Sequence, residues 1–352
     1  MLKFDTVIIG GGLAGLSCGI HLLDSKPGSD VVVIDRLQDD AYDRYHRTCG
    51  EALSKATEKE MKPIRLVGQR HTIDMIEEVW PGNLIIKAKI RGFIIDRPIF
   101  LHSLQDDFIG RGGHLINGSI ARIVTEGDYY LLHTGEEVIR CRWLVGADGA
   151  FSRVRKSLFL ETPKELLAVK QFVVQRFSED DQTIRFVYDE KYGGGYLWEF
   201  PCGSYLNTGY PKGCGHLIDD IVEENGRYIP LGSLENVVQG HACLVGDAAA
   251  MVNPLSFGGI RIALLSGKMA AKALAKGDLS NYQKWWIKSS FSDPVFYDCY
   301  VTSKGWDNED MWQFIHPFRR GYGVIPFVLA YLSRPNQRKM ITSYYRSFKL
   351  GW

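Results

Sequence analysis

The first 35 residues constrain the fold more strongly than any other part of the chain. An apolar, β-branched run leads into Gly10-Gly11-Gly12-Leu13-Ala14-Gly15, and the helical pattern LSCGIHLL follows. A second apolar run, residues 31–35, ends on Asp35. This order predicts a strand–helix–strand unit that binds a dinucleotide, with Gly10 for the tight turn, Gly12 for approach of the pyrophosphate and Gly15 for helix packing. The helix N-terminus would donate amides to the phosphates, and Asp35 would accept hydrogen bonds from the adenosine ribose.

Composition excludes several classes of protein. The 352 residues are 45% hydrophobic and 24% charged with a net charge of +1, which is typical of a globular protein and gives no field that attracts nucleic acid. Seven scattered cysteines without a CxxC pair predict reduced thiols, no metal site and a cytoplasmic location. We expect no signal peptide, and no transmembrane helix because no run of 18 apolar residues occurs.

Two further glycine–acid motifs indicate which dinucleotide is bound, since FAD and NAD share the opening motif. Residues 143–149 read WLVGADG, and an apolar run at 242–245 ends in Gly246-Asp247, followed by the pair Gly258-Gly259. With these three motifs in order, residues 1–270 resemble the FAD-dependent family that includes aromatic-ring hydroxylases and geranylgeranyl reductases.

That resemblance implies roles for individual residues. Asp247 would contact the ribityl and phosphate region of FAD, and the amides of Gly258, Gly259 and Ile260 would meet the pyrimidine end of the flavin. Arg97, in the segment GFIIDRPIFLHSL, would meet the ribityl or phosphate side; the alternative is a helix-start arginine that faces solvent. The full predicted cofactor set is Gly10, Gly12, Ala14, Gly15, Asp35, Arg36, Gly50, Arg97, Asp148, Asp247, Gly258, Gly259 and Ile260.

Two motifs point to the geranylgeranyl reductase branch: Cys49-Gly50-Glu51, and residues 196–201, YLWEFP. In an extended chain Tyr196, Trp198 and Phe200 share one face. The resemblance implies that Tyr196, Trp198, Phe200 and Pro201 bind substrate in a cavity over the flavin, shaped for an isoprenoid chain. Ordinary core packing is the alternative.

Cys49 is the predicted catalytic residue, as the acid or local polar group beside the flavin. The alternative is a small buried thiol held for packing. Glu51 would either support Cys49 or be a surface carboxylate.

The predicted fold class is α/β (α+β mixed), with a Rossmann-like FAD-binding domain, an inserted antiparallel-sheet substrate domain and a helical C-terminal region. We assign residues 1–53, 97–160 and 231–284 to the FAD-binding domain, 54–96 and 161–230 to the substrate domain, and 285–352 to the C-terminal region. No second G-x-G-x-x-G follows an apolar strand, so the electron donor, NAD(P)H or ferredoxin, stays open.

The C-terminal region is aromatic and basic. Residues 285–352 hold 17 of the 42 aromatic residues, and residues 313–352 contain seven Lys or Arg and no Asp or Glu. This composition suits peripheral contact with an anionic membrane surface or capture of a prenyl phosphate. A helical cap with a solvated basic face is the alternative.

Together these features predict an FAD-dependent reductase that hydrogenates isoprenoid C=C bonds of a geranylgeranyl or other prenyl lipid by hydride transfer from reduced flavin. The alternatives are a flavin monooxygenase or halogenase acting on an aromatic substrate, and a flavoprotein quinone oxidoreductase.

Overall fold

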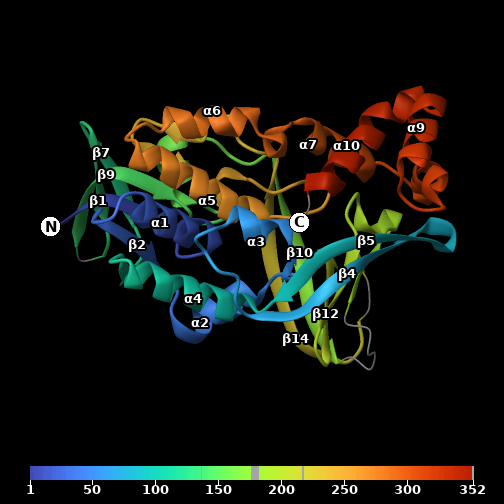
Figure 1. Ribbon diagram of the computed structural model, residues 1–352, viewed down its shortest axis with the longest axis horizontal. Coiled ribbons are helices and arrows are strands. Elements are labelled where there is room, and N and C mark those ends of the chain that lie inside the picture. Colours follow the sequence, from blue (N-terminus) through green and yellow to red (C-terminus); the bar gives the residue numbers. More distant parts are fainter. Residues whose placement is uncertain (136, 176–181, 216–217, 351–352) are drawn as a thin grey trace.

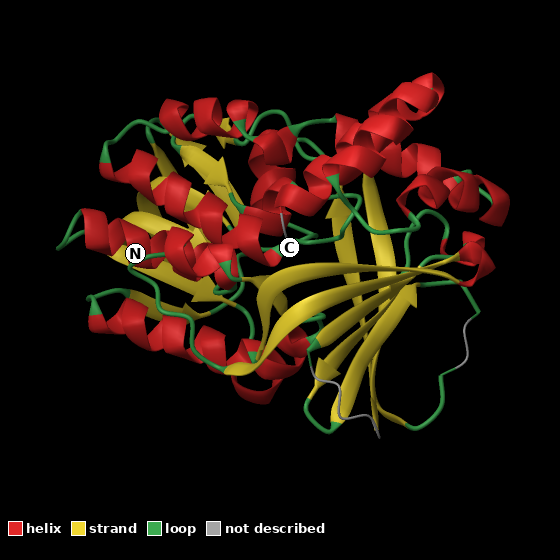
Figure 2. Cartoon of the chain, turned by 45° about the vertical axis from the view of Figure 1, so that its right-hand side comes forward, coloured by secondary structure: helices red, strands yellow, loops and turns green. Residues whose placement is uncertain are grey.

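The computed structural model describes residues 1–135, 137–175, 182–215 and 218–350. Two eight-stranded sheets form its framework, with helices packed against the first sheet and a helical C-terminal region beside the second (Figures 1 and 2).

The first sheet has the order β15-β16-β9-β1-β2-β6, and β8 and β7 extend from β9. β16, β9, β1, β2 and β6 pair with one another in parallel. β2, β16 and the second half of β1 are buried on both faces, as expected for apolar strands of a parallel sheet. The strands are β1 (Leu2–Ile9), β2 (Val31–Asp35), β6 (His114–Asn117), β7 (Arg122–Glu126), β8 (Tyr129–His133), β9 (Val138–Gly146), β15 (Val238–Gln239) and β16 (Ala242–Leu244).

The second sheet has the order β14-β10-β13-β12-β11-β4-β5-β3. Its pairs are antiparallel except for β11 with β4, so the predicted antiparallel sheet contains one parallel pair. The strands are β3 (Ala52–Ser54), β4 (Gln69–Trp80), β5 (Leu84–Ile95), β10 (Glu165–Gln175), β11 (Thr183–Val187), β12 (Leu197–Cys202), β13 (Tyr205–Pro211) and β14 (Ile221–Leu231).

The helices of the first part of the chain and of the segment after β16 pack near the first sheet, whereas α7 to α10 form the C-terminal region (Figure 1). They are α1 (Leu13–Ser25), α2 (Asp39–Arg47), α3 (Ala56–Glu60), α4 (Arg97–Gly110), α5 (Ile260–Ala275), α6 (Ser280–Lys288), α7 (Val295–Lys304), α8 (Asn308–Ile315), α9 (Val324–Ser333) and α10 (Arg338–Leu350). Within the described residues, no helix combines the length and the apolar character needed to cross a bilayer.

Glycines allow the close packing that places α1 and α5. A Cβ on Gly15 would lie 2.0 Å from the Gly10 carbonyl oxygen, and a Cβ on Gly267 would lie 2.3 Å from the Ala14 carbonyl oxygen. Larger residues would push α1 away from the strand that precedes it and α5 away from α1. The two helices therefore reach the same region of the molecule with their N-terminal ends.

The predicted fold class is confirmed: α and β elements mix, one sheet is largely parallel with helices packed on it, and a second sheet and a helical C-terminal region accompany it. The boundaries of the three predicted domains stay a prediction.

Candidate functional site

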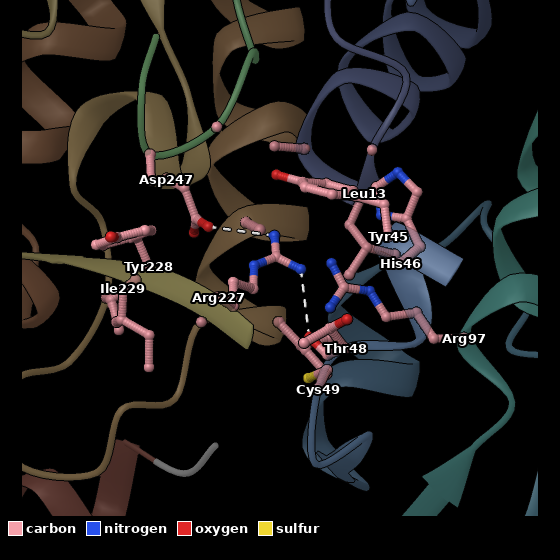
Figure 3. Close-up of a pocket in the computed structure, with 18 of the residues that line it drawn as sticks. Leu13, Tyr45, His46, Thr48, Cys49, Arg97, Arg227, Tyr228, Ile229 and Asp247 are labelled. Atoms are coloured by element: carbon pink, nitrogen blue, oxygen red, sulfur yellow. Dashed lines mark hydrogen bonds and ion pairs between the residues drawn. The ribbon is translucent and has the colours of Figure 1, made fainter. Parts of the chain in front are cut away.

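A cavity of about 600 Å³ collects residues from both sheets and from the ends of α1, α4 and α5 (Figure 3). Its size is within the usual range for small-molecule sites. The predicted site residues that line it are Gly10, Gly12, Ala14, Asp35, Arg36, Cys49, Gly50, Arg97, Asp148, Tyr196, Trp198, Phe200, Asp247, Gly258, Gly259 and Ile260.

Gly15 and Pro201 do not line this cavity. Gly15 lies inside α1, where it allows close packing, and the Pro201 carbonyl oxygen lies 2.9 Å from Nε2 of His71 within the second sheet. A direct role of these two residues in ligand binding stays a prediction, and their observed contacts are structural.

The glycine-rich sequence before α1 forms the tight turn that was predicted for it. Gly10 has φ +110°, and a Cβ there would lie 2.3 Å from the Ala147 carbonyl oxygen. Asp35 holds the turn, since its Oδ2 accepts a hydrogen bond from Gly11 N at 2.6 Å and its Oδ1 accepts one from Leu37 N at 2.8 Å. The turn thus leaves the start of α1 open toward the cavity.

Two helix N-termini face the cavity without a side-chain cap. Gly12 precedes α1 and Gly259 precedes α5, and the first turn of each helix contains no acidic residue. The uncapped amides and the positive end of each helix dipole favour a negatively charged ligand. This geometry fits a dinucleotide phosphate at α1 and the electron-rich end of a flavin at α5.

Two arginines add positive charge from opposite sides. Arg97 begins α4, and its buried Nε has no hydrogen-bond partner among the described residues. Arg227 of β14 lies 3.5 Å from Oδ2 of Asp247 and 5.0 Å from the ring centre of Tyr45. Both guanidinium groups point into the cavity (Figure 3). The alternative of a solvent-facing Arg97 is therefore wrong.

His46 also faces the cavity in a buried position. Burial, followed by the charges of Arg97 and Arg227, holds the pKa of this imidazole well below its ordinary value. Its Nδ1 is buried and has no hydrogen-bond partner among the described residues. Like Arg97 Nε, this orphaned polar atom fits a site built for a polar ligand, because unpaired buried polar atoms are costly otherwise.

Asp148 has a structural role in addition to its place in the cavity wall. Its carboxylate accepts hydrogen bonds from Ser152 Oγ at 2.5 Å and from Arg153 N at 2.6 Å. It thereby holds the short helical turn that follows, in which residues Arg155–Phe159 are π-helical.

Cys49, Gly50 and the aromatic strand form one unit. Asn207 of β13 donates from Nδ2 to the Cys49 carbonyl oxygen at 2.6 Å, and its Oδ1 accepts from Trp198 Nε1 at 3.3 Å. A Cβ on Gly50 would lie 2.5 Å from the ring of Phe200, so glycine is needed for this approach. The Cys-Gly-Glu segment is therefore fixed directly against the aromatic strand.

Glu51 is buried beside these residues. Its Oε1 accepts a hydrogen bond from Arg97 N at 3.1 Å, and burial raises the pKa of its carboxyl to about 7. The alternative of a surface carboxylate is wrong. Cys49, in contrast, is only partly buried; the residue lines the cavity, and its Sγ accepts a hydrogen bond from Glu51 N at 3.4 Å.

Tyr196, Trp198 and Phe200 share one face, as predicted, and line the same cavity. Phe186 meets the rings of Tyr196 and Phe200 edge-on at 4.9 and 5.4 Å between centres. The Tyr196 hydroxyl donates to the Ser256 carbonyl oxygen at 2.5 Å. Because this hydroxyl is already engaged, the wall presents mainly aromatic carbon to a ligand.

Among the lining or bridging residues that sequence reasoning missed, four are polar or charged groups next to residues 48–51 or the arginines: Tyr45, His46, Asn207 and Arg227. Tyr45 and His46 lie in α2, whose sequence DDAYDRYHR carries no motif. Asn207 and Arg227 lie in strands whose alternation predicted only a sheet. No signal in the chain connected them to residues 48–51.

The chain is similar in sequence to a known family and to curated proteins. A family model described as lycopene cyclase protein matches residues 5–178. The chain is 27% identical over 325 residues to digeranylgeranylglycerophospholipid reductase 1 of Methanothermobacter thermautotrophicus, with 79% of each chain covered.

Solved structures share the fold. A geranylgeranyl bacteriochlorophyll reductase-like protein from Thermoplasma acidophilum superimposes with a TM-score of 0.77 at 16% identity, covering 97% of this chain and 99% of that one. A p-nitrophenol 4-monooxygenase from Pseudomonas putida gives 0.64 at 14% identity, covering 99% and 98%. The resemblance predicted from the motifs is thus confirmed: the chain is similar in sequence to the digeranylgeranylglycerophospholipid reductases and shares its fold with a geranylgeranyl reductase-like protein and with a monooxygenase.

Proposed function

We propose that this protein hydrogenates isoprenoid C=C bonds of a geranylgeranyl or other prenyl lipid. The observation that carries the proposal is the Asn207 bridge between Cys49 and Trp198. It fixes the backbone of Cys49 against an apolar aromatic wall, in the same cavity that the uncapped starts of α1 and α5 enter. The names of the relatives, digeranylgeranylglycerophospholipid reductases, support a prenyl substrate.

FAD fits the polar part of the cavity. The amides of α1, together with Arg97 and Arg227, would hold its phosphates and ribityl chain, and the start of α5 would stabilise negative charge on the ring. When bound and reduced, FAD supplies the hydride equivalent that, with one proton, saturates a C=C bond. All residues predicted to bind the cofactor keep that role in this proposal. Gly15 would contribute indirectly, because it allows α1 to pack closely on β1.

The chain's own residues would position the alkene and supply the proton. Tyr196, Trp198 and Phe200 would hold the isoprenoid against one face of the cavity and exclude water from it. Cys49 Sγ would donate the proton to the alkene carbon next to the one that receives hydride. Its partly buried position at the cavity supports this role.

The proposal also covers location and electron supply. The protein would be cytoplasmic and would contact the membrane surface through residues 313–352. An external donor, NAD(P)H or ferredoxin, would reduce the flavin. We also propose the three-part division of the chain into FAD-binding, substrate and C-terminal regions.

An anaerobic half-reaction tests the function. Bound flavin is reduced with dithionite, the excess is removed, and a geranylgeranyl lipid is added while flavin absorbance is followed. We expect the oxidised spectrum to return and mass spectrometry to show a product heavier by two hydrogens per reduced bond. No reoxidation by several prenyl lipids, together with fast reoxidation by oxygen or a quinone, would contradict the proposal and favour a monooxygenase or a quinone oxidoreductase.

Variants test the role of Cys49. Cys49→Ala should slow flavin reoxidation by prenyl lipid about 100-fold or more, the usual range for loss of a proton donor. The matched control is Cys214→Ser, which changes a partly buried thiol that does not line the cavity. Equal rates for Cys49→Ala and the control would assign Cys49 to packing.

A further inference from the structure

A second cavity, of about 260 Å³, lies within the C-terminal region. The segment 314–318, α9 and α10 enclose it, and the lining is dominated by Phe314, Phe318, Phe327, Ile341 and Phe348. Nothing in the proposed chemistry uses this space. An apolar cavity of this kind binds apolar ligands and excludes water.

Two of its three lining tyrosines, Tyr322 and Tyr344, have hydroxyls that are bonded to a residue outside the cavity lining, and the ring of the third, Tyr345, lies 4.7 Å from Lys349 Nζ. The hydroxyls of Tyr322 and Tyr344 both donate to the buried carboxylate of Glu78 in β4, the latter at 2.7 Å. Burial raises the pKa of Glu78, and these donors partly offset that effect. The two phenols therefore contribute mainly ring surface to the cavity, which suits a hydrocarbon chain rather than a polar ligand.

An exposed apolar helix adjoins the cavity. Val324 and Phe327 of α9 line the cavity, while Val324, Ile325, Leu329 and Leu332 are exposed by 73, 74, 61 and 63%. Among the ten residues of α9, only Ala330 is buried. The helix lies at the end of the molecule opposite the N-terminus (Figure 1). Contiguous exposed apolar surface of this kind marks an interaction site.

The charge of this region identifies the partner surface. Residues 313–352 contain no acidic residue. Of their seven cations, Lys339 and Arg346 pair with Asp298 and Asp293 of α7 and the segment before it. The other five form no ion pair with a described carboxylate: Arg319, Arg320, Arg334, Arg338 and Lys349. Unpaired cations around exposed apolar side chains complement an anionic bilayer surface, where each contributes about 1 kcal/mol of binding.

Aromatic contacts connect the second cavity with the first. Phe348 lines the second cavity and also packs against the cluster that holds Tyr196, Trp198 and Phe200. Tyr188 lies 5.7 Å from Tyr196 between ring centres, and its hydroxyl lies 3.4 Å from that of Tyr344. The two cavities are therefore joined through a continuous layer of aromatic side chains.

We infer that α9 lies on an anionic lipid bilayer and that the cavity beside it binds one hydrocarbon chain of a bilayer lipid. The identification of that hydrocarbon chain as an isoprenoid rests on the proposed function. Docking and chain binding themselves require no catalysis. They can be measured with saturated lipids that the enzyme cannot reduce.

Flotation tests the docking surface. Flavin-loaded protein is mixed with phosphatidylcholine vesicles that contain or lack an equal share of phosphatidylglycerol. We expect wild-type protein to float with anionic vesicles and Leu329→Asp to bind at least tenfold more weakly, because it places a charge at the apolar face. The control is Ile287→Asp, a residue of α6 that is 65% exposed. Equal flotation of wild type on neutral vesicles, or of Leu329→Asp on anionic ones, would overturn the inference.

A single-chain probe tests the cavity. Lysophosphatidylglycerol with a saturated chain is titrated calorimetrically, below its micelle concentration, into wild type and into Ile341→Trp, which fills the cavity. We expect at least tenfold weaker binding by the variant, with an unchanged flavin spectrum as the check on folding. Equal binding by both proteins, or none by wild type, would overturn the inference. A protein that binds this probe but fails to reduce prenyl chains would refute only the proposed function.

Discussion

Replacing Glu51 by glutamine should change how the stability of the protein depends on pH. Glu51 is 2% exposed and lies in the wall of the main cavity. Burial, partly offset by the hydrogen bond from Arg97 N, raises the pKa of its carboxyl from 4.5 to about 7. Glutamine has nearly the same shape and can accept the same hydrogen bond, but it cannot ionise.

The direction in which the free energy of unfolding changes with pH follows from the number of protons that the folded and the unfolded chain bind. Below pH 4.5 the carboxyl is protonated in both the folded and the unfolded chain, and its contribution to stability is fully present. Between pH 4.5 and 7 the unfolded chain has released the proton and the folded chain still holds it, so stability is lost as pH rises. Each unit of pKa difference corresponds to about 1.4 kcal/mol, which gives a total loss of about 3 kcal/mol by pH 7 to 8.

Urea unfolding of the flavin-loaded protein, followed by tryptophan fluorescence from pH 4.5 to 8, measures this effect. The free energy of unfolding of Glu51→Gln should equal that of wild type at the acidic end and exceed it by about 3 kcal/mol at pH 8. The control is Glu58→Gln, which removes an exposed carboxyl from the short helix α3. A constant difference between Glu51→Gln and wild type across this range would refute the reasoning.

Three further outcomes are expected. Arg97→Ala should weaken FAD binding about 10- to 100-fold in a flavin fluorescence titration, because a buried guanidinium that points into the cavity is lost; unchanged affinity would place the flavin elsewhere. Gly10→Ala should yield no folded, flavin-containing protein by gel filtration, since its Cβ would lie 2.3 Å from the Ala147 carbonyl oxygen at φ +110°. Tyr344→Phe should lower the free energy of unfolding by about 1–3 kcal/mol in urea, because the buried Glu78 carboxylate loses a donor, whereas an unchanged midpoint would show that water replaces the hydroxyl.

The glycine-rich part of the cavity wall could be predicted from sequence. The turn at Gly10, the start of α1 and the start of α5 depend on contacts among neighbouring residues and on backbone angles that glycine permits. Such requirements act over a few residues and leave a motif in the chain. The common face of Tyr196, Trp198 and Phe200 was predictable for the same reason, since alternation is a local property of a strand.

The other half of the site depends on pairings that no local pattern encodes. Asn207 meets the Cys49 carbonyl across 158 residues, and Arg227 meets the Thr48 carbonyl across 179. These contacts exist because β14 pairs with β10, β10 with β13 and β13 with β12, each in a defined register, and because residues of this sheet meet the segment around Cys49. A shift of one residue would turn each side chain to the opposite face.

The sequence by itself determined a strand, glycine-rich turn and helix at the start of the chain, the order of the later glycine–acid motifs and an aromatic strand face, because each depends on short-range geometry. Only the tertiary structure decided that Glu51 is buried, that Arg97 points inward, and that α9 exposes its apolar residues. Burial is a property of what packs against a residue. The chain on either side of that residue does not specify it.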